Sequence, residues 1–92
     1  MEAERRNERN RRTKPVRDKI QSVEKEIEKI ENRIGEIEEA MAEPDFYDDA
    51  DKVKKFSLEY DQLKADLTDR YSQWEENQQR LEVIEAELGS EQ

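Results

Sequence analysis

The sequence predicts an all-α protein folded as an antiparallel two-helix coiled-coil hairpin. Two apolar ladders, each with alternating spacings of four and three residues, lead to this prediction, and a short turn with a proline separates them. The first ladder consists of Val16, Ile20, Val23, Ile27, Ile30, Ile34, Ile37 and Met41. The second ladder has two polar breaks and consists of Val53, Phe56, Tyr60, Leu63, Leu67, Arg70, Trp74, Asn77, Leu81, Ile84 and Leu88.

The composition supports long helices with a narrow seam. In a chain of 92 residues, 47% of the residues are charged and 32% are hydrophobic. So little apolar material excludes a large globular core, and the unbroken ladders favour helix over disorder. We therefore expect one domain with a first helix over 15–42, a second helix over 49–88 and a short tail over 89–92.

Residues 1–14 are expected to be a basic lead-in from an upstream region outside this sequence. The apolar ladder does not continue into this polar stretch, so it is either frayed or helical with support from a partner. Thr13 is a plausible N-cap for the first helix, with Pro15 in its first turn. If helix continues upstream instead, Pro15 should kink it.

The turn at the tip of the hairpin is predicted over 43–48. Pro44 disfavours helical geometry at the preceding residue, and Asp48 or Asp49 can cap the second helix. Two aromatic residues in so short a turn indicate that they fold back and seal the tip, although a partner-binding finger remains an alternative. The residues predicted to pack there are Met41, Phe46, Tyr47, Val53 and Phe56.

At the other end of the hairpin, the second apolar ladder extends further than the first. Leu81, Ile84 and Leu88 would face the polar lead-in, so their apolar partners are missing from this chain. Such a patch tends to find a partner, and these residues are therefore candidates for self-association as a homodimer.

Composition and motifs argue against catalysis by this chain. It contains no Cys and no His, and its two glycines cannot build a phosphate-binding loop. The carboxylates at the turn lack the spacing of a calcium loop, and a two-helix rod offers no pocket to separate the pKa values of paired acids. We expect no catalytic, cofactor-binding or metal-binding residue. The absence of a long apolar segment predicts a soluble, cytoplasmic protein without membrane contact.

The net charge of −9 conceals an uneven distribution. Up to Lys19 the chain carries eight basic residues against four acids, whereas the rest is strongly acidic. Clustered cations can bind phosphates without sequence preference. The candidate nucleic-acid-binding residues are Arg5, Arg6, Arg9, Arg11, Arg12, Lys14 and Arg17. Alternatively, these cations pair internally with acids of the second helix, namely Glu75, Glu76, Glu82, Glu85 and Glu87.

Three short motifs carry a family resemblance. They are Arg12-x-x-Pro15-Val16-Arg17, the turn Met41-Ala42-Glu43-Pro44-Asp45-Phe46-Tyr47-Asp48-Asp49, and Tyr71-x-x-Trp74-Glu75-Glu76. Over roughly residues 12–88, the chain resembles the C-terminal coiled-coil domain of ABC-F ATPases, the soluble twin-cassette branch that includes the Uup and YheS proteins.

The resemblance implies a fragment of a bacterial ATP-binding protein. ATP and Mg would be bound by nucleotide-binding cassettes in cis, upstream of this chain, and the parent would associate with DNA, RNA or the ribosome. We therefore expect a non-catalytic interaction module that contributes to nucleic-acid association. The alternative function is a purely structural spacer or homodimerisation hairpin.

Overall fold

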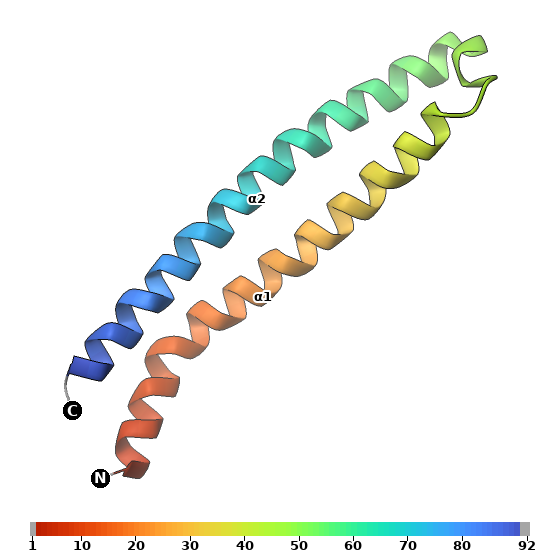
Figure 1. Cartoon of the computed structure of the whole chain (residues 1–92). Helices are drawn as coiled ribbons and strands as arrows, with labels where there is room; N and C mark the ends of the chain where they lie inside the picture. Colours follow the sequence, from red (N-terminus) through yellow and green to blue (C-terminus); the bar gives the residue numbers. More distant parts are fainter. Residues whose placement is uncertain (1, 91–92) are drawn as a thin grey trace.

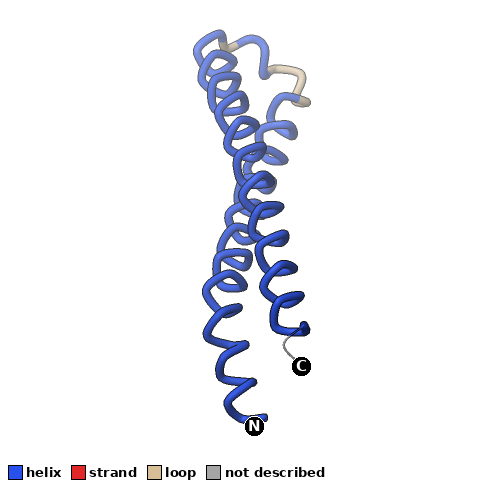
Figure 2. Tube along the Cα trace, turned by 90° about the vertical axis from the view of Figure 1, so that its left-hand side faces the viewer, coloured by secondary structure: helices blue, strands red, loops and turns tan. Residues whose placement is uncertain are grey.

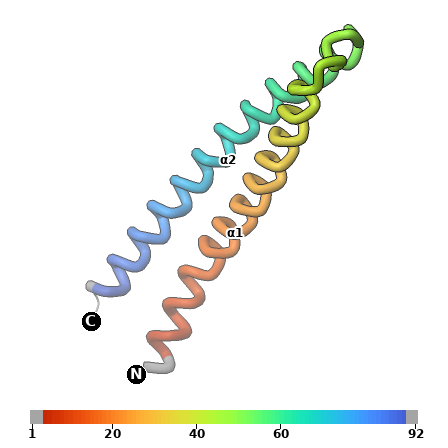
Figure 3. The backbone as a smooth tube through the Cα atoms, turned by 45° about the vertical axis from the view of Figure 1, so that its right-hand side comes forward, coloured from red at the N-terminus to blue at the C-terminus, as the bar shows by residue number. Residues whose placement is uncertain are grey.

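A computed structural model of the chain describes residues 2–90 and shows two long helices lying side by side in opposite directions (Figure 1). Helix α1 spans Glu2–Met41, the 3-10 helix η1 spans Phe46–Asp48, and helix α2 spans Ala50–Ser90. The rod measures 69 × 18 × 15 Å. The predicted all-α hairpin is confirmed, and the view in Figure 3 shows the same pairing of the two helices along the rod.

The first helix begins much earlier than the predicted boundary at residue 15. Thr13 does not cap a helix, since it lies inside α1, where its hydroxyl donates a 2.7 Å hydrogen bond to the backbone oxygen of Arg9. Arg and Glu favour helix at exposed positions, so a polar stretch can extend a helix that has already formed downstream. The predicted lead-in 1–14 is therefore helical from Glu2 onward, and Met1 lies outside the described residues.

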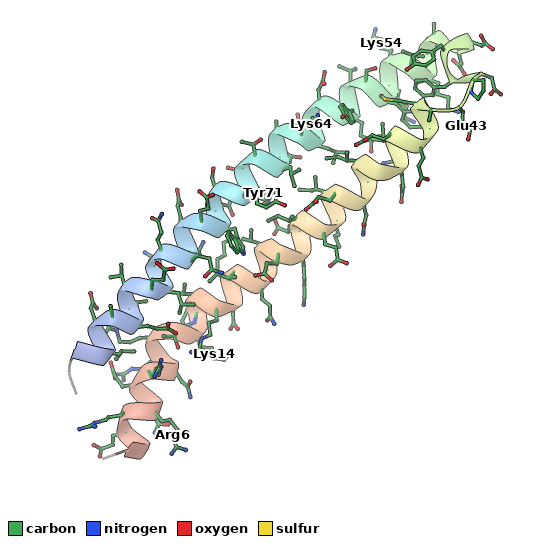
Figure 4. All side chains as sticks on the ribbon, in the orientation of Figure 1. Arg6, Lys14, Glu43, Lys54, Lys64 and Tyr71 are labelled. Atoms are coloured by element: carbon green, nitrogen blue, oxygen red, sulfur yellow. The ribbon has the colours of Figure 1, made fainter. Side chains whose placement is uncertain are left out.

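Helix α1 passes through Pro15 with a visible change of direction. Pro15 has no N–H to bond the oxygen of Arg11, and its ring crowds that carbonyl. The Thr13 bond to the preceding turn also favours bending. In Figure 1 the red first turns run at an angle to the rest of α1, and in Figure 4 this change lies beside Lys14. This agrees with the kink expected if the helix continued upstream of Pro15.

The buried core is a single stripe on α1 that α2 covers. Among the residues whose burial the structure describes, every buried apolar side chain belongs to α1 except Phe46 in the turn; the others are Val16, Ile20, Val23, Ile27, Ile34 and Ile37. The larger apolar side chains of α2 lie across this stripe and remain half-buried. The larger side chains of α2 cover the smaller Val and Ile side chains of α1. The α1 stripe is therefore buried, while the covering side chains of α2 keep an exposed edge.

The turn is built by backbone hydrogen bonds that end one helix and begin the next. The N–H of Glu43 donates to the oxygen of Ala40 at 3.2 Å, which tightens the last turn of α1 before Pro44. The N–H of Phe46 then donates to the oxygen of Glu43 at 3.1 Å. Asp49 caps α2, because its carboxylate accepts a 3.1 Å bond from the N–H of Lys52.

The second helix starts and ends close to the predicted limits. It begins at Ala50, directly after the Asp49 cap, and continues through Gly89 to Ser90. Half of the predicted tail is therefore helical, and Glu91 and Gln92 lie outside the described residues. The first turns of α1 reach beyond this end of α2 (Figure 2), so that the N-terminal end of the rod is a single helix.

Candidate nucleic-acid interface

The base of the hairpin, defined as residues 2–20 of α1 with 77–90 of α2, carries the predicted basic residues. Arg5, Arg6 and Arg9 are exposed, and within the described residues none of the three forms an ion pair or hydrogen bond through its side chain. Arg6 is labelled on these first turns in Figure 4. Three unneutralised guanidinium groups thus lie on less than two turns of helix.

The other four basic candidates have acidic partners. Arg11 pairs with Glu8, and the ammonium of Lys14 lies 2.9 Å from the carboxylate of Asp18, both within α1. Two further pairs cross to α2. They join Arg12 to Glu87, and Arg17 to Glu85 at 3.8 Å.

The internal-pairing interpretation therefore applies to part of the basic segment, and nucleic-acid binding by the remaining cations stays a prediction. Internal pairing with α2 involves two of the five expected acids, and among the described residues Glu75, Glu76 and Glu82 form no ion pair with the segment. The cations nearest the N-terminus stay unpaired in the described structure, and the first turns of α1 reach beyond the end of α2 (Figure 2). Among the described residues of the base, five cations form no ion pair: Arg5, Arg6 and Arg9 on the first turns of α1, and Lys19 and Arg80 further along the two helices.

The middle of the hairpin is joined by polar contacts that the sequence did not reveal. Arg33 donates to both carboxylate oxygens of Glu59, at 2.6 and 3.0 Å. This hydrogen-bonded pair lowers the pKa of Glu59 and raises the pKa of Arg33. Arg70, a predicted polar break in the ladder, pairs with Glu26, which raises the pKa of Arg70.

Two aromatic residues of α2 make similar contacts with acids of α1. The Tyr71 hydroxyl donates to Glu31 at 2.9 Å, and the pKa of Tyr71 is raised because this bond favours the neutral phenol. The indole N–H of Trp74 donates to Glu24 at 3.1 Å, one turn from Ile20. The sequence did contain a chemical signal for these contacts: the polar ends of Tyr and Trp residues at or beside the seam need a hydrogen-bond partner, and the carboxylates of the facing helix supply it.

The aromatic seal at the tip is correct for Phe46 and wrong for Tyr47. Phe46 is 2% exposed and stacks on Phe56 with ring centroids 5.8 Å apart. Met41, Val53 and Phe56 are half-buried around it. Tyr47 touches the edge of the Phe46 ring but is 67% exposed, because successive residues of a turn point in different directions and only one enters the space between the helix ends.

Cations surround the aromatic pair at the tip. The ammonium of Lys52 lies 5.9 Å from the centroids of both Phe46 and Phe56, and the guanidinium of Arg33 lies 5.8 Å from that of Phe56. These contacts are within the range in which a cation is attracted to a ring face. Lys52 therefore has a structural role at the tip.

The apolar candidates for self-association are only partly covered. Leu81, Ile84 and Leu88 are half-buried, and Thr13 and Val16 on the facing part of α1 are buried. Helix α1 extends along this part of α2, so the three residues lie beside the lead-in, as the sequence predicted, and that lead-in is helical. Self-association through them stays a prediction.

The described residues contain no group of three or more acidic side chains placed to hold a metal ion. Within the same range, neither helix is long and apolar enough to cross a membrane.

The fold and the distribution of charge describe a two-helix hairpin with an acidic tip and a cluster of basic residues at the base. The family model described as ABC transporter C-terminal domain matches residues 14–77, more than half of the chain. The chain belongs to this family. No curated protein and no solved structure matches it.

Proposed function

We propose that this hairpin is a non-catalytic accessory domain of an ABC-F ATPase and that it contributes to the association of its parent with nucleic acid. The ligand would be DNA, RNA or the RNA of a ribosome. In this proposal ATP and Mg are bound by cassettes elsewhere in a cytoplasmic parent, and the hairpin supplies a binding surface.

One observation carries the proposal. Arg5, Arg6 and Arg9 are exposed and unpaired within the described structure, on the first turns of α1. An exposed, unpaired guanidinium can exchange condensed counterions on a phosphate backbone for a direct contact, and release of those ions drives binding. Cations already paired with carboxylates gain less, because the pair must first be broken.

Charge also indicates which part of the hairpin would avoid phosphate. Five exposed acids surround the tip: Glu43, Asp45, Asp48, Asp49 and Asp51. Like charges at this density repel a polyanion over about a Debye length, roughly 10 Å at 0.1 M salt. Nucleic acid would therefore contact the base and leave the tip free.

The test is an electrophoretic mobility shift with duplex DNA, branched DNA and RNA at several salt concentrations. We expect weak binding without sequence preference, and a steep loss of affinity as salt rises. A variant with Arg5, Arg6, Arg9, Arg11 and Arg12 replaced by Gln should lose the binding while circular dichroism shows that the helices remain.

The matched control removes positive charge near the tip. Lys54→Gln and Lys55→Gln together should change the affinity little, although they also make the chain more acidic. Unchanged affinity in the arginine variant would move the contact elsewhere. No binding by the unmodified chain at low salt would contradict the proposal and favour a structural spacer or homodimerisation hairpin.

A further inference from the structure

A groove runs between the two helices at the base, near the unpaired arginines of the first turns of α1. It is lined by three side-chain amides, those of Asn10 and Gln21 from α1 and Gln78 from α2, and by the apolar side chains of Ile20 and Leu81. Within the described residues, none of the three amides forms a hydrogen bond. Each amide offers two donors and one acceptor, so the groove presents unused hydrogen-bonding groups of both kinds beside an apolar surface.

The charged side chains of the groove differ from the amides because they already have partners. Lys14 bonds Asp18 at 2.9 Å, Arg17 approaches Glu85 at 3.8 Å, and Glu24 accepts the indole N–H of Trp74. The lining thus holds two cations and two carboxylates, which balance. A neutral polar group fits such a groove better than a phosphate does.

The groove lies on the same edge of α1 as one of the unpaired arginines. Arg6, Asn10, Arg17 and Gln21 follow one another at spacings of four, seven and four residues, which are the repeats of one helix face. A ligand that extends along this edge would meet a free guanidinium first and the unpartnered amides next.

We propose that the groove takes unpaired bases and that the hairpin therefore prefers single-stranded nucleic acid to duplex. This inference rests on the proposed function. An unpaired base is flat, mostly neutral, and carries donors and acceptors on its free edge, which matches the amides and the apolar lining. Arg6 and its unpaired neighbours Arg5 and Arg9 hold the phosphates on the adjacent turns.

A duplex would not present the pairing edges of its bases to this groove. Its pairing edges are occupied, and its groove edges are reached by elements that protrude, such as a helix in the major groove. Arginine contacts alone give the opposite preference, because duplex has the higher charge density and releases more counterions for each contact. A preference for single strands would therefore come from the groove.

The experiment measures fluorescence anisotropy with a labelled single strand of mixed sequence and with the duplex made from it, at matched salt concentrations. We expect the single strand to bind roughly tenfold more tightly, as two or three added hydrogen bonds allow. A variant with Asn10→Ala, Gln21→Ala and Gln78→Ala should lose this preference. Its affinity for duplex and the dependence of binding on salt should not change, because no charge is removed.

Gln79→Ala is the matched control, since Gln79 is the exposed neighbour of Gln78 and does not line the groove. It should keep the full preference. Alanine favours helix, so all of these variants should stay folded.

Two results would overturn the inference while leaving the proposed function intact: equal or tighter binding of duplex by the unmodified chain, or an unchanged preference in the triple variant. A chain that binds neither ligand at low salt would overturn both.

Discussion

The two ends of the hairpin are held together in different ways. At the tip, Phe46 is buried, stacks on Phe56 and has cations over the rings. At the base, the last buried side chains are Val16 and Thr13, and ion pairs at the surface join the helices around them, Arg17 with Glu85 and Arg12 with Glu87.

This difference makes the tip the more stable of the two ends. Burial of an aromatic side chain contributes several kcal/mol, whereas an exposed ion pair contributes about 0–1 kcal/mol. The tip is therefore held more firmly than the base. The base is easier to open, and it is also where unpaired cations and unpartnered amides are available to a ligand.

The largest effect that tests this comparison is expected at the tip. Phe46→Ala should lower the free energy of unfolding by about 3 kcal/mol, because it removes a buried ring and leaves a cavity between the helix ends. Urea unfolding followed by circular dichroism measures this change.

Tyr47→Ala is the internal control for Phe46→Ala. Its ring is 67% exposed, so the loss should stay below about 1 kcal/mol. Equal losses for the two variants would mean that both rings seal the tip, as the sequence alone suggested.

Tyr47 shows where sequence reasoning reached its limit at the tip. The ladders and Pro44 determine that two helices meet at a turn, and Asp49 caps α2 as one of two predicted candidates. Which of two adjacent aromatic residues enters the core depends on the backbone of a three-residue 3-10 helix. No periodicity in the sequence encodes that choice.

The base shows a second limit. Thr13 and Pro15 have the spacing of a helix start, and the polar residues before them offer no seam, so local preference favoured a boundary at residue 15. The helix continues through Pro15 because it bends there, which relieves the clash of the proline ring, instead of ending. The amides of the groove were missed for a related reason, since they come together only when α1 runs on beside Gln78.

The bend leads to the second prediction, at the base. Pro15→Ala should raise the free energy of unfolding by about 1–3 kcal/mol, because it restores a donor to the oxygen of Arg11 and removes the ring clash. Lys14→Ala, at the neighbouring exposed position, should change stability little. A loss of stability in Pro15→Ala would show that the bend itself positions the first turns against α2.

The third prediction concerns pH and the polar contacts of the middle region. The pKa of Glu59 is lowered by the hydrogen bonds from Arg33, so this pair stabilises the folded chain above the ordinary glutamate pKa of 4.5. That contribution is lost as the pH falls through the lowered pKa of Glu59.

Thermal unfolding from neutral pH down to about pH 2.5 tests this prediction. The unmodified chain should be more stable than Glu59→Gln at neutral pH, and the difference should shrink in acid. Glu75→Gln, on the exposed face of α2, should show no comparable difference. A gap between the unmodified chain and Glu59→Gln that persists in acid would mean that the substitution acts through packing.

The smallest effect is expected for the ion pairs of the base. A double-mutant cycle of Arg17→Gln and Glu85→Gln should give a coupling of about 0.5 kcal/mol or less, since both side chains are largely solvated and their charged atoms are 3.8 Å apart. The same two positions can also be tested in the presence of single-stranded nucleic acid. If the ligand occupies the groove beside Arg17, the Glu85→Gln variant should bind more tightly, because Arg17 is released from its ion pair. The control is Glu82→Gln, which removes an equal charge outside any ion pair of the described chain and should tighten binding less. A coupling above about 1 kcal/mol in the free chain would contradict the contrast between the two ends, because this ion pair would then stabilise the base about as much as an apolar contact does.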